Sequence, residues 1–137
     1  MARVLIIPCG CRGRALAASL VAAGHAVRGT TRGDHVAEIE AAGAEAYVGD
    51  PDRIGTLMGA LSGVTIVCWL MGTLPVPELH EGRLRMLCEK LVDTGVRGVV
   101  HEGSYEELSR RSSETWQIPL AFAGDDPRAA VNRLLGV

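Results

Sequence analysis

The sequence predicts an α/β protein built on a three-layer, doubly wound parallel sheet of about six strands flanked by helices. Short apolar runs alternate with helix-forming segments along the chain, and the connections between them are short. The apolar runs are continuous, as in strands buried on both faces of a parallel sheet. No linker-like segment or repeat interrupts this alternation. We therefore expect residues 1–137 to form a single domain.

The first half of the chain supplies three strands and three helices. Residues 4–7 are an apolar run, and the helix predicted after it spans 13–23, with Gly24 as its stop. The next predicted elements are a strand at 25–31, a helix at 34–43, a strand at 44–50 and a helix from Pro51 to about Ser62. Asp34 is the expected N-cap of the helix at 34–43, and Gly43 its expected end.

The second half continues the same alternation. Its most apolar stretch, 64–72, predicts a central strand, and a loop at 73–77 follows. The remaining predicted elements are a helix at 78–94, a strand at 96–104, a short helix at 105–113, a strand at 117–123 and a closing helix at 126–135.

Composition and charge exclude several classes of function. The net charge of −2 gives no electrostatic case for binding nucleic acid or an anionic membrane. No apolar run reaches the roughly 18–20 residues that span a bilayer. We expect a cytoplasmic protein with reduced cysteines. The pair Cys9 and Cys11 lacks further ligands at zinc spacing, so we expect no metal site.

The stretch "PCGCRGRAL" at 8–16 lies between the first strand and the first helix. It reads P-x-G-x-x-G, one residue away from the dinucleotide fingerprint G-x-G-x-x-G. Gly10 would let the pyrophosphate approach the backbone, and Gly13 would let the helix pack closely against the strand. Pro8 replaces the glycine of the tight turn and has no N–H to offer. We favour dinucleotide binding, with a structural relic of such a loop as the alternative.

The end of the second strand decides the choice of cofactor. NAD-selective proteins usually place an acidic residue there, whereas this chain has "GTTR", with Thr31 followed by Arg32. A hydroxyl and a guanidinium suit a 2′-phosphate. We therefore expect NADP, with NAD as second choice. The alternative is that Arg32 is simply a solvated loop arginine. Arg28 is expected to lie elsewhere along the strand.

The segments "IIPCGCRGRALAASLVAAGHAVRGTTR", "YVGD" and "GVRGVVHEGS" together resemble the core of extended and atypical short-chain dehydrogenases/reductases, especially the NAD-dependent epimerase/dehydratase type. The resemblance covers about residues 3–104. It implies that Asp50 meets the adenine, although Asp50 could equally be the N-cap of a helix beginning at Pro51. The full set of cofactor-binding residues that it implies is Gly10, Cys11, Arg12, Gly13, Thr31, Arg32, Asp50, Leu70, Met71 and Gly72.

The chain departs from that family at the catalytic residues. These enzymes carry a tyrosine with a lysine four residues later, which lowers the pKa of the tyrosine. Here Tyr105 is followed by Ser109, and Lys90 is the last lysine. Ser104 matches the family's serine after the fifth strand. Extended members also append a substrate domain, whereas this chain ends just after its sixth predicted strand and helix.

No catalytic constellation is recognisable in the sequence. The catalytic candidates are Ser104, Tyr105 and Glu102, with His80 and His101 near the same end of the sheet. Three functions remain open. The first is a cofactor-binding sensor or regulatory protein without the usual reaction. The second is a minimal oxidoreductase or epimerase whose substrate site is completed by a partner chain, for which a homodimer is the expected form. The third is a protein-interaction module that has lost the nucleotide.

Overall fold

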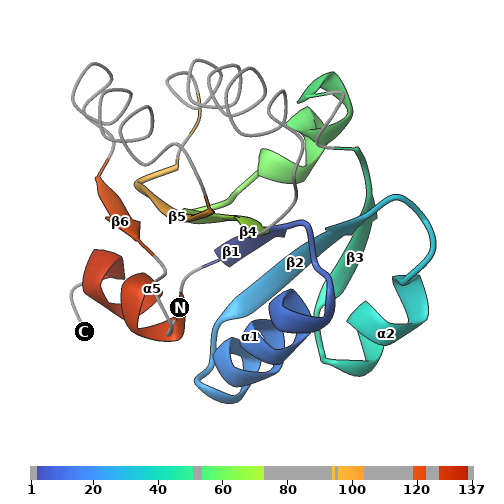
Figure 1. The fold of residues 1–137 in the computed structure, drawn as a ribbon, viewed down its shortest axis with the longest axis horizontal. Helices are drawn as coiled ribbons and strands as arrows, with labels where there is room; N and C mark the ends of the chain where they lie inside the picture. The colour runs from blue at the N-terminus through green and yellow to red at the C-terminus, as the bar shows by residue number, and fades with distance from the viewer. Residues whose placement is uncertain are drawn as a thin grey trace.

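The structure, a computed structural model, describes residues 3–50, 54–72, 94, 96–103, 119–122 and 127–135. Within these ranges six strands form one sheet in the order β3-β2-β1-β4-β5-β6, and every neighbouring pair is parallel. The chain builds outward from β1 to one edge and then continues on the other side of β1 (Figure 1). This is the doubly wound order of the Rossmann fold, so the predicted fold class is confirmed.

The six strands lie within about three residues of the predicted bounds. Apolar and small residues predominate in them. The strands are β1 Arg3–Ile7, β2 Ala26–Thr31, β3 Glu45–Val48, β4 Ile66–Gly72, β5 Gly98–Gly103 and β6 Leu120–Phe122.

Helices cover both faces of this sheet. The described helices are α1 Cys11–Ala22, α2 Val36–Ala41, the 3₁₀ helix η1 Ile54–Leu61 and α5 Pro127–Leu135. In Figure 1, α1, α2 and α5 lie on one face, and η1 lies on the other. The segment predicted as a helix from Pro51 to Ser62 is thus a 3₁₀ helix where it is described. Its sequence IGTLMGAL holds two glycines and a threonine, which are poor α-helix formers.

The sheet separates two apolar cores. Alternate residues of β1 supply them, because successive side chains of a strand point to opposite faces. Leu5 and Ile7 join Leu57, Trp69 and others under η1. Val4 and Ile6 join the inward faces of α1, α2 and α5 on the other side. This burial on both faces explains why the strands read as continuous apolar runs.

Glycines end the two N-terminal helices as predicted. Gly24 follows α1 with φ +94°, and Gly43 follows α2 with φ +91°. A residue with a side chain adopts this left-handed conformation rarely, so each glycine terminates its helix and turns the chain into the next strand. Helix α1 begins at Cys11, two residues before the predicted start.

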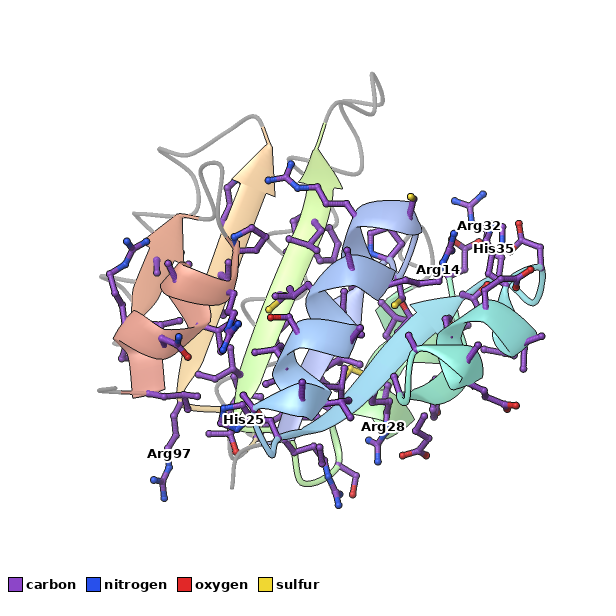
Figure 2. The ribbon with its side chains drawn as sticks, turned by 90° about the horizontal axis from the view of Figure 1, so that it is seen from below. Arg14, His25, Arg28, Arg32, His35 and Arg97 are labelled. Atoms are coloured by element: carbon purple, nitrogen blue, oxygen red, sulfur yellow. The ribbon has the colours of Figure 1, made fainter. Side chains whose placement is uncertain are left out.

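Arg28 is a buried structural residue of β2. Its Nη1 donates to the carbonyl oxygens of Ala60 (2.6 Å) and Ser62 (3.2 Å), at the end of η1. Its Nε donates to Oε2 of Glu45 on β3 at 3.2 Å. Figure 2 places Arg28 at the end of the sheet opposite to Arg32. The expectation that Arg28 lies away from the loops at the carboxyl ends of the strands is therefore confirmed.

Several predicted elements lie outside the described residues. They are the loop at 73–77, nearly all of the helix at 78–94, the short helix at 105–113 and the start of the helix at Pro51. Among the residues that are described, no helix is both long and apolar enough to cross a membrane.

Candidate nucleotide site at the carboxyl ends of β1 and β2

A backbone hydrogen bond holds the loop between β1 and α1 against β2. The N–H of Cys9 donates to the carbonyl oxygen of Thr30 at 2.8 Å. Pro8, joined to Ile7 by a cis peptide bond, has no N–H. Because the donor that holds the loop is Cys9, proline at position 8 removes no hydrogen bond between the loop and β2.

The two glycines of the loop lie in different surroundings. A Cβ added to Gly13 would come within 3.0 Å of Cγ2 of Ile6 and 3.1 Å of the carbonyl oxygen of Pro8. A Cβ added to Gly10 would meet no atom within 4 Å. Gly13 is therefore the glycine that lets α1 pack closely against β1. Gly10 faces open space, where a ligand could approach the backbone.

The start of α1 borders that open space. Gly10 is the N-cap, with φ −81° and ψ −160°, and no side chain caps the helix. The first turn holds no acidic residue. The first N–H groups of a helix lack intrahelical acceptors, and the helix dipole adds partial positive charge there. The arrangement suits an anion such as a pyrophosphate.

Thr31, at the end of β2, organises the turn into α2. Its hydroxyl donates to Oδ1 of Asp34 at 3.0 Å and accepts the N–H groups of Gly33 (3.2 Å) and His35 (3.3 Å). The hydrogen bond from Thr31 is the main reason why the pKa of Asp34 is lowered. The prediction that Asp34 is the N-cap of α2 was wrong. The N-cap is His35, because the Asp34 carboxylate is bound to Thr31 instead.

Arg32 and Asp50, both predicted to bind the adenosine half of the cofactor, contact each other. Nη2 of Arg32 lies 3.3 Å from Oδ1 of Asp50. The N–H of Gly49 donates to the carbonyl oxygen of Thr31 at 2.9 Å, which holds the ends of β2 and β3 together. Three predicted residues, Thr31, Arg32 and Asp50, thus meet at one edge of the sheet. The N–H of Asp50 donates to Oγ1 of Thr56 at 2.8 Å.

Two residues near the loop were not predicted as part of the site. Cys9 is 2% exposed, and burial raises its pKa to about 11, although the Arg14 guanidinium acts in the opposite direction. Nη1 of Arg14 is itself buried and has no hydrogen-bond partner in the described structure. The sequence signal for Arg14 was a basic residue directly after the last glycine of the loop. Cys11 and Arg12, by contrast, are exposed on the first turn of α1.

The predicted residues within β4 and β5, which are Leu70, Met71, Gly72 and Glu102, lie at the carboxyl ends of these strands. Leu70 is 8% exposed, and its side chain is packed in the core under α1 and α5. The pairing of β4 with β5 is irregular between Leu70 and Gly72, so Met71 occupies a bulge. Glu102 pairs with Leu70 through the strand backbone. The side chains of Met71 and Glu102, and all of His80, Ser104 and Tyr105, lie outside the described residues.

His101 and a pocket lined by Arg3, Arg28 and Glu45 are not part of this candidate site. His101 is 1% exposed and pairs in register with the fully buried Trp69 on β4. A pocket of about 210 Å³ opens at the start of β1 and β2, between Arg3, Arg28 and Glu45, at the opposite end of the sheet. In the described part of the chain, no group of three or more His, Cys, Asp or Glu residues is placed to hold a metal ion.

The sequence matches no family model and no curated protein. Its structure resembles the Citrobacter sp. triphenylmethane reductase complexed with NADP(H), with a TM-score of 0.71 and 17% identity, over 89% of this chain and 48% of that one. It resembles an isoflavone reductase with a TM-score of 0.65 and 17% identity, over 88% and 48% of the two chains.

A further match is a short-chain dehydrogenase/reductase superfamily protein from Agrobacterium tumefaciens with bound NAD. Its TM-score is 0.57 and its identity 24%, over 73% of this chain and 31% of that one. At these low identities, the structural similarity shows the fold alone. The chain has a Rossmann fold similar to that of these proteins, and it spans about half the length of the first reductases that it matches.

Proposed function

We propose that this chain is a dinucleotide-binding Rossmann domain that prefers NADP over NAD and acts as a cofactor sensor or regulatory protein. The observation that carries the proposal is the difference between the two loop glycines. Gly13 is packed against β1, whereas Gly10 faces open space at the uncapped start of α1. Packing alone would not require a glycine at position 10. Close approach of a pyrophosphate would.

The preference for NADP rests on the end of β2. Arg32 is exposed there and carries a guanidinium that suits a phosphate. Thr31 contributes by shaping the turn, because its hydroxyl already donates to Asp34. The triphenylmethane reductase is described with NADP(H) and the Agrobacterium protein with NAD, so this fold accepts both cofactors.

The sensor role follows from the sequence around Tyr105. The tyrosine has Ser109 in place of the lysine that would lower its pKa, so the usual proton transfer has no activated acid. We propose that the cofactor is bound and released without being consumed. A single domain over 1–137 and a cytoplasmic location remain predictions from the sequence.

Calorimetric titration with NADPH and NADH tests the proposal. We expect the wild-type protein to bind NADPH more tightly than NADH. Arg32→Ala should weaken NADPH by about 10-fold or more, since a charge-assisted hydrogen bond contributes roughly 1.5–3 kcal/mol, and should change NADH little. Equal losses of affinity for NADPH and NADH would show that Arg32 does not bind the 2′-phosphate. The absence of heat with either cofactor would favour an interaction module instead.

The second candidate function is a minimal oxidoreductase or epimerase whose substrate site is completed by another copy of the chain. It is favoured by the structural resemblance to reductases. The discriminating measurement is NADPH oxidation over a panel of carbonyl compounds, together with the native mass. Turnover by a dimer would support this function, and binding without turnover would support the sensor.

A further inference from the structure

Arg14 is in the first turn of α1, the helix that packs against β2. Its N–H donates to the carbonyl oxygen of Gly10 at 2.8 Å, which forms the first backbone bond of α1. Its guanidinium is near enough to the Cys9 thiol to oppose the rise in the pKa of that thiol. The sulfur of Cys9 lies directly over Gly29 of β2, 2.6 Å from where a Cβ would be. The Arg14 side chain therefore lies near Cys9, on the α1 side of β2.

The charge of Arg14 is not balanced by the described structure. Nη1 is buried without a hydrogen-bond partner, and no described carboxylate forms an ion pair with the guanidinium. The neighbouring Cys9 does not compensate, because burial keeps its thiol protonated at neutral pH. A buried donor on a charged group costs free energy until it finds an acceptor. Arg14 as a whole residue is only partly buried, so a rotation of its side chain would bring this donor to an anion arriving at this edge.

Arg32 is in the opposite situation. Oδ1 of Asp50 lies 3.3 Å from its Nη2, and the Asp34 carboxylate is close enough for the two charges to interact. Because the pKa of Asp34 is lowered, this carboxylate is ionised at neutral pH. Two negative charges thus offset the positive charge of Arg32. A phosphate would have to compete with Asp50 for Arg32, whereas it would meet no such competition at Arg14.

We propose that Arg14 binds the 2′-phosphate of NADP together with Arg32 and is a second determinant of the preference for NADP over NAD. This inference rests on the proposed function. A dinucleotide with its pyrophosphate at Gly10 and its adenosine at the end of β2 passes the Arg14 side chain. A guanidinium matches the geometry of a phosphate with two parallel hydrogen bonds. Figure 2 shows Arg14 toward the same end of the sheet as Arg32 and His35.

The test uses adenosine 2′,5′-bisphosphate and 5′-AMP, which differ only in the 2′-phosphate, beside NADP⁺ and NAD⁺. We expect Arg14→Met to weaken adenosine 2′,5′-bisphosphate and NADP⁺ by about 10- to 100-fold, and 5′-AMP and NAD⁺ by less than about 3-fold. The affinity of Arg14→Lys for adenosine 2′,5′-bisphosphate and NADP⁺ should fall between those of wild type and Arg14→Met, because lysine keeps the positive charge but cannot form the two parallel hydrogen bonds of a guanidinium. Arg97→Met is the matched control. Arg97 is an exposed arginine at the opposite end of the sheet, so this variant should bind like wild type.

The outcomes separate this inference from the proposed function. If wild type binds neither dinucleotide, the proposed function fails and the inference fails with it. If wild type prefers NADP⁺ and Arg14→Met keeps that preference, only the inference fails. Equal losses for adenosine 2′,5′-bisphosphate and 5′-AMP would also overturn it, because they would place Arg14 at the shared phosphate. Should Arg14→Met fail to fold by circular dichroism, unchanged selectivity in Arg14→Lys is the contradicting result.

Discussion

At the scale of single residues, Cys9 and Gly29 determine how the loop sits on β2. The thiol is buried in the core that α1 and α2 share with the sheet. It occupies the space above Gly29, since a Cβ there would lie 2.6 Å from Sγ and 2.7 Å from Cβ of Cys9. A strand interior usually disfavours glycine, so its presence marks a close approach. The cysteine is thus a packing residue of the loop.

Gly29→Ala is therefore expected to destabilise the fold. The added methyl group must displace Cys9, and overpacking of this kind costs about 1–3 kcal/mol. Urea denaturation followed by circular dichroism measures the change in the free energy of unfolding. Gly55→Ala is the control, because a Cβ there meets nothing within 4 Å. A Gly29→Ala variant as stable as Gly55→Ala would show that Cys9 does not need this space.

The residue scale also shows where the sequence was insufficient. Asp34 has the position and chemistry of an N-cap, but its carboxylate is bound to the Thr31 hydroxyl. That hydroxyl in turn accepts the N–H of His35, the observed N-cap. The Thr31 hydroxyl and the Asp34 carboxylate could both accept backbone N–H groups in this turn, and the spacing of the residues does not show which of them does. Arg14 was missed for a related reason, since only the fold reveals that its Nη1 is buried without an acceptor.

At the scale of elements, Arg28 joins three pieces of structure through one guanidinium. It connects β2 to β3 through Glu45 and to the end of η1 through the carbonyl oxygens of Ala60 and Ser62. A carbonyl at the end of a helix has no intrahelical donor, so this arginine serves as its cap. Because η1 is a 3₁₀ helix, whose internal hydrogen bonds are weaker, we expect Arg28 to contribute to holding it in position.

We expect Arg28→Met to lower the free energy of unfolding by about 2–4 kcal/mol, since it leaves a buried carbonyl without its charged donor. Glu45→Gln should cost less than about 1 kcal/mol, because the Glu45 side chain is 64% exposed. Both values come from the same urea titration. If the two variants are equally stable, the carbonyl contacts of Arg28 contribute nothing, and η1 is held by its apolar side chains alone.

At the scale of the whole molecule, the continuous apolar runs were sufficient to predict the fold. They place six strands in one sheet, and the short connections between them leave few topologies other than the doubly wound one. The element ends were less accurate, as at α1, which begins at Cys11. The tertiary contacts that decide such ends, for example the packing of Gly13 on Ile6, are not local in the sequence.

The sequence predicted the part of the candidate site that follows from the order of the strands. Parallel strands bring their carboxyl ends to one edge, so the loop after β1 and the residues after β2 and β3 were bound to meet there. The ion pair between Arg32 and Asp50 was not predictable, because it depends on side-chain geometry. That pair offsets part of the positive charge of Arg32, and for this reason we propose Arg14 as a further residue that selects the cofactor.

The central claim is that the loop between β1 and α1 binds a dinucleotide at Gly10. Calorimetric titration of wild type and Gly10→Val with NADP⁺ tests it most directly. Valine has space in the free protein and suits the extended φ of −81°, so the variant should keep its circular dichroism spectrum and melting temperature. It should bind NADP⁺ at least about 10-fold more weakly, because its side chain blocks the pyrophosphate from the N–H groups of α1. A wild-type protein that gives no heat, or a folded Gly10→Val protein that binds as tightly as wild type, would contradict the claim.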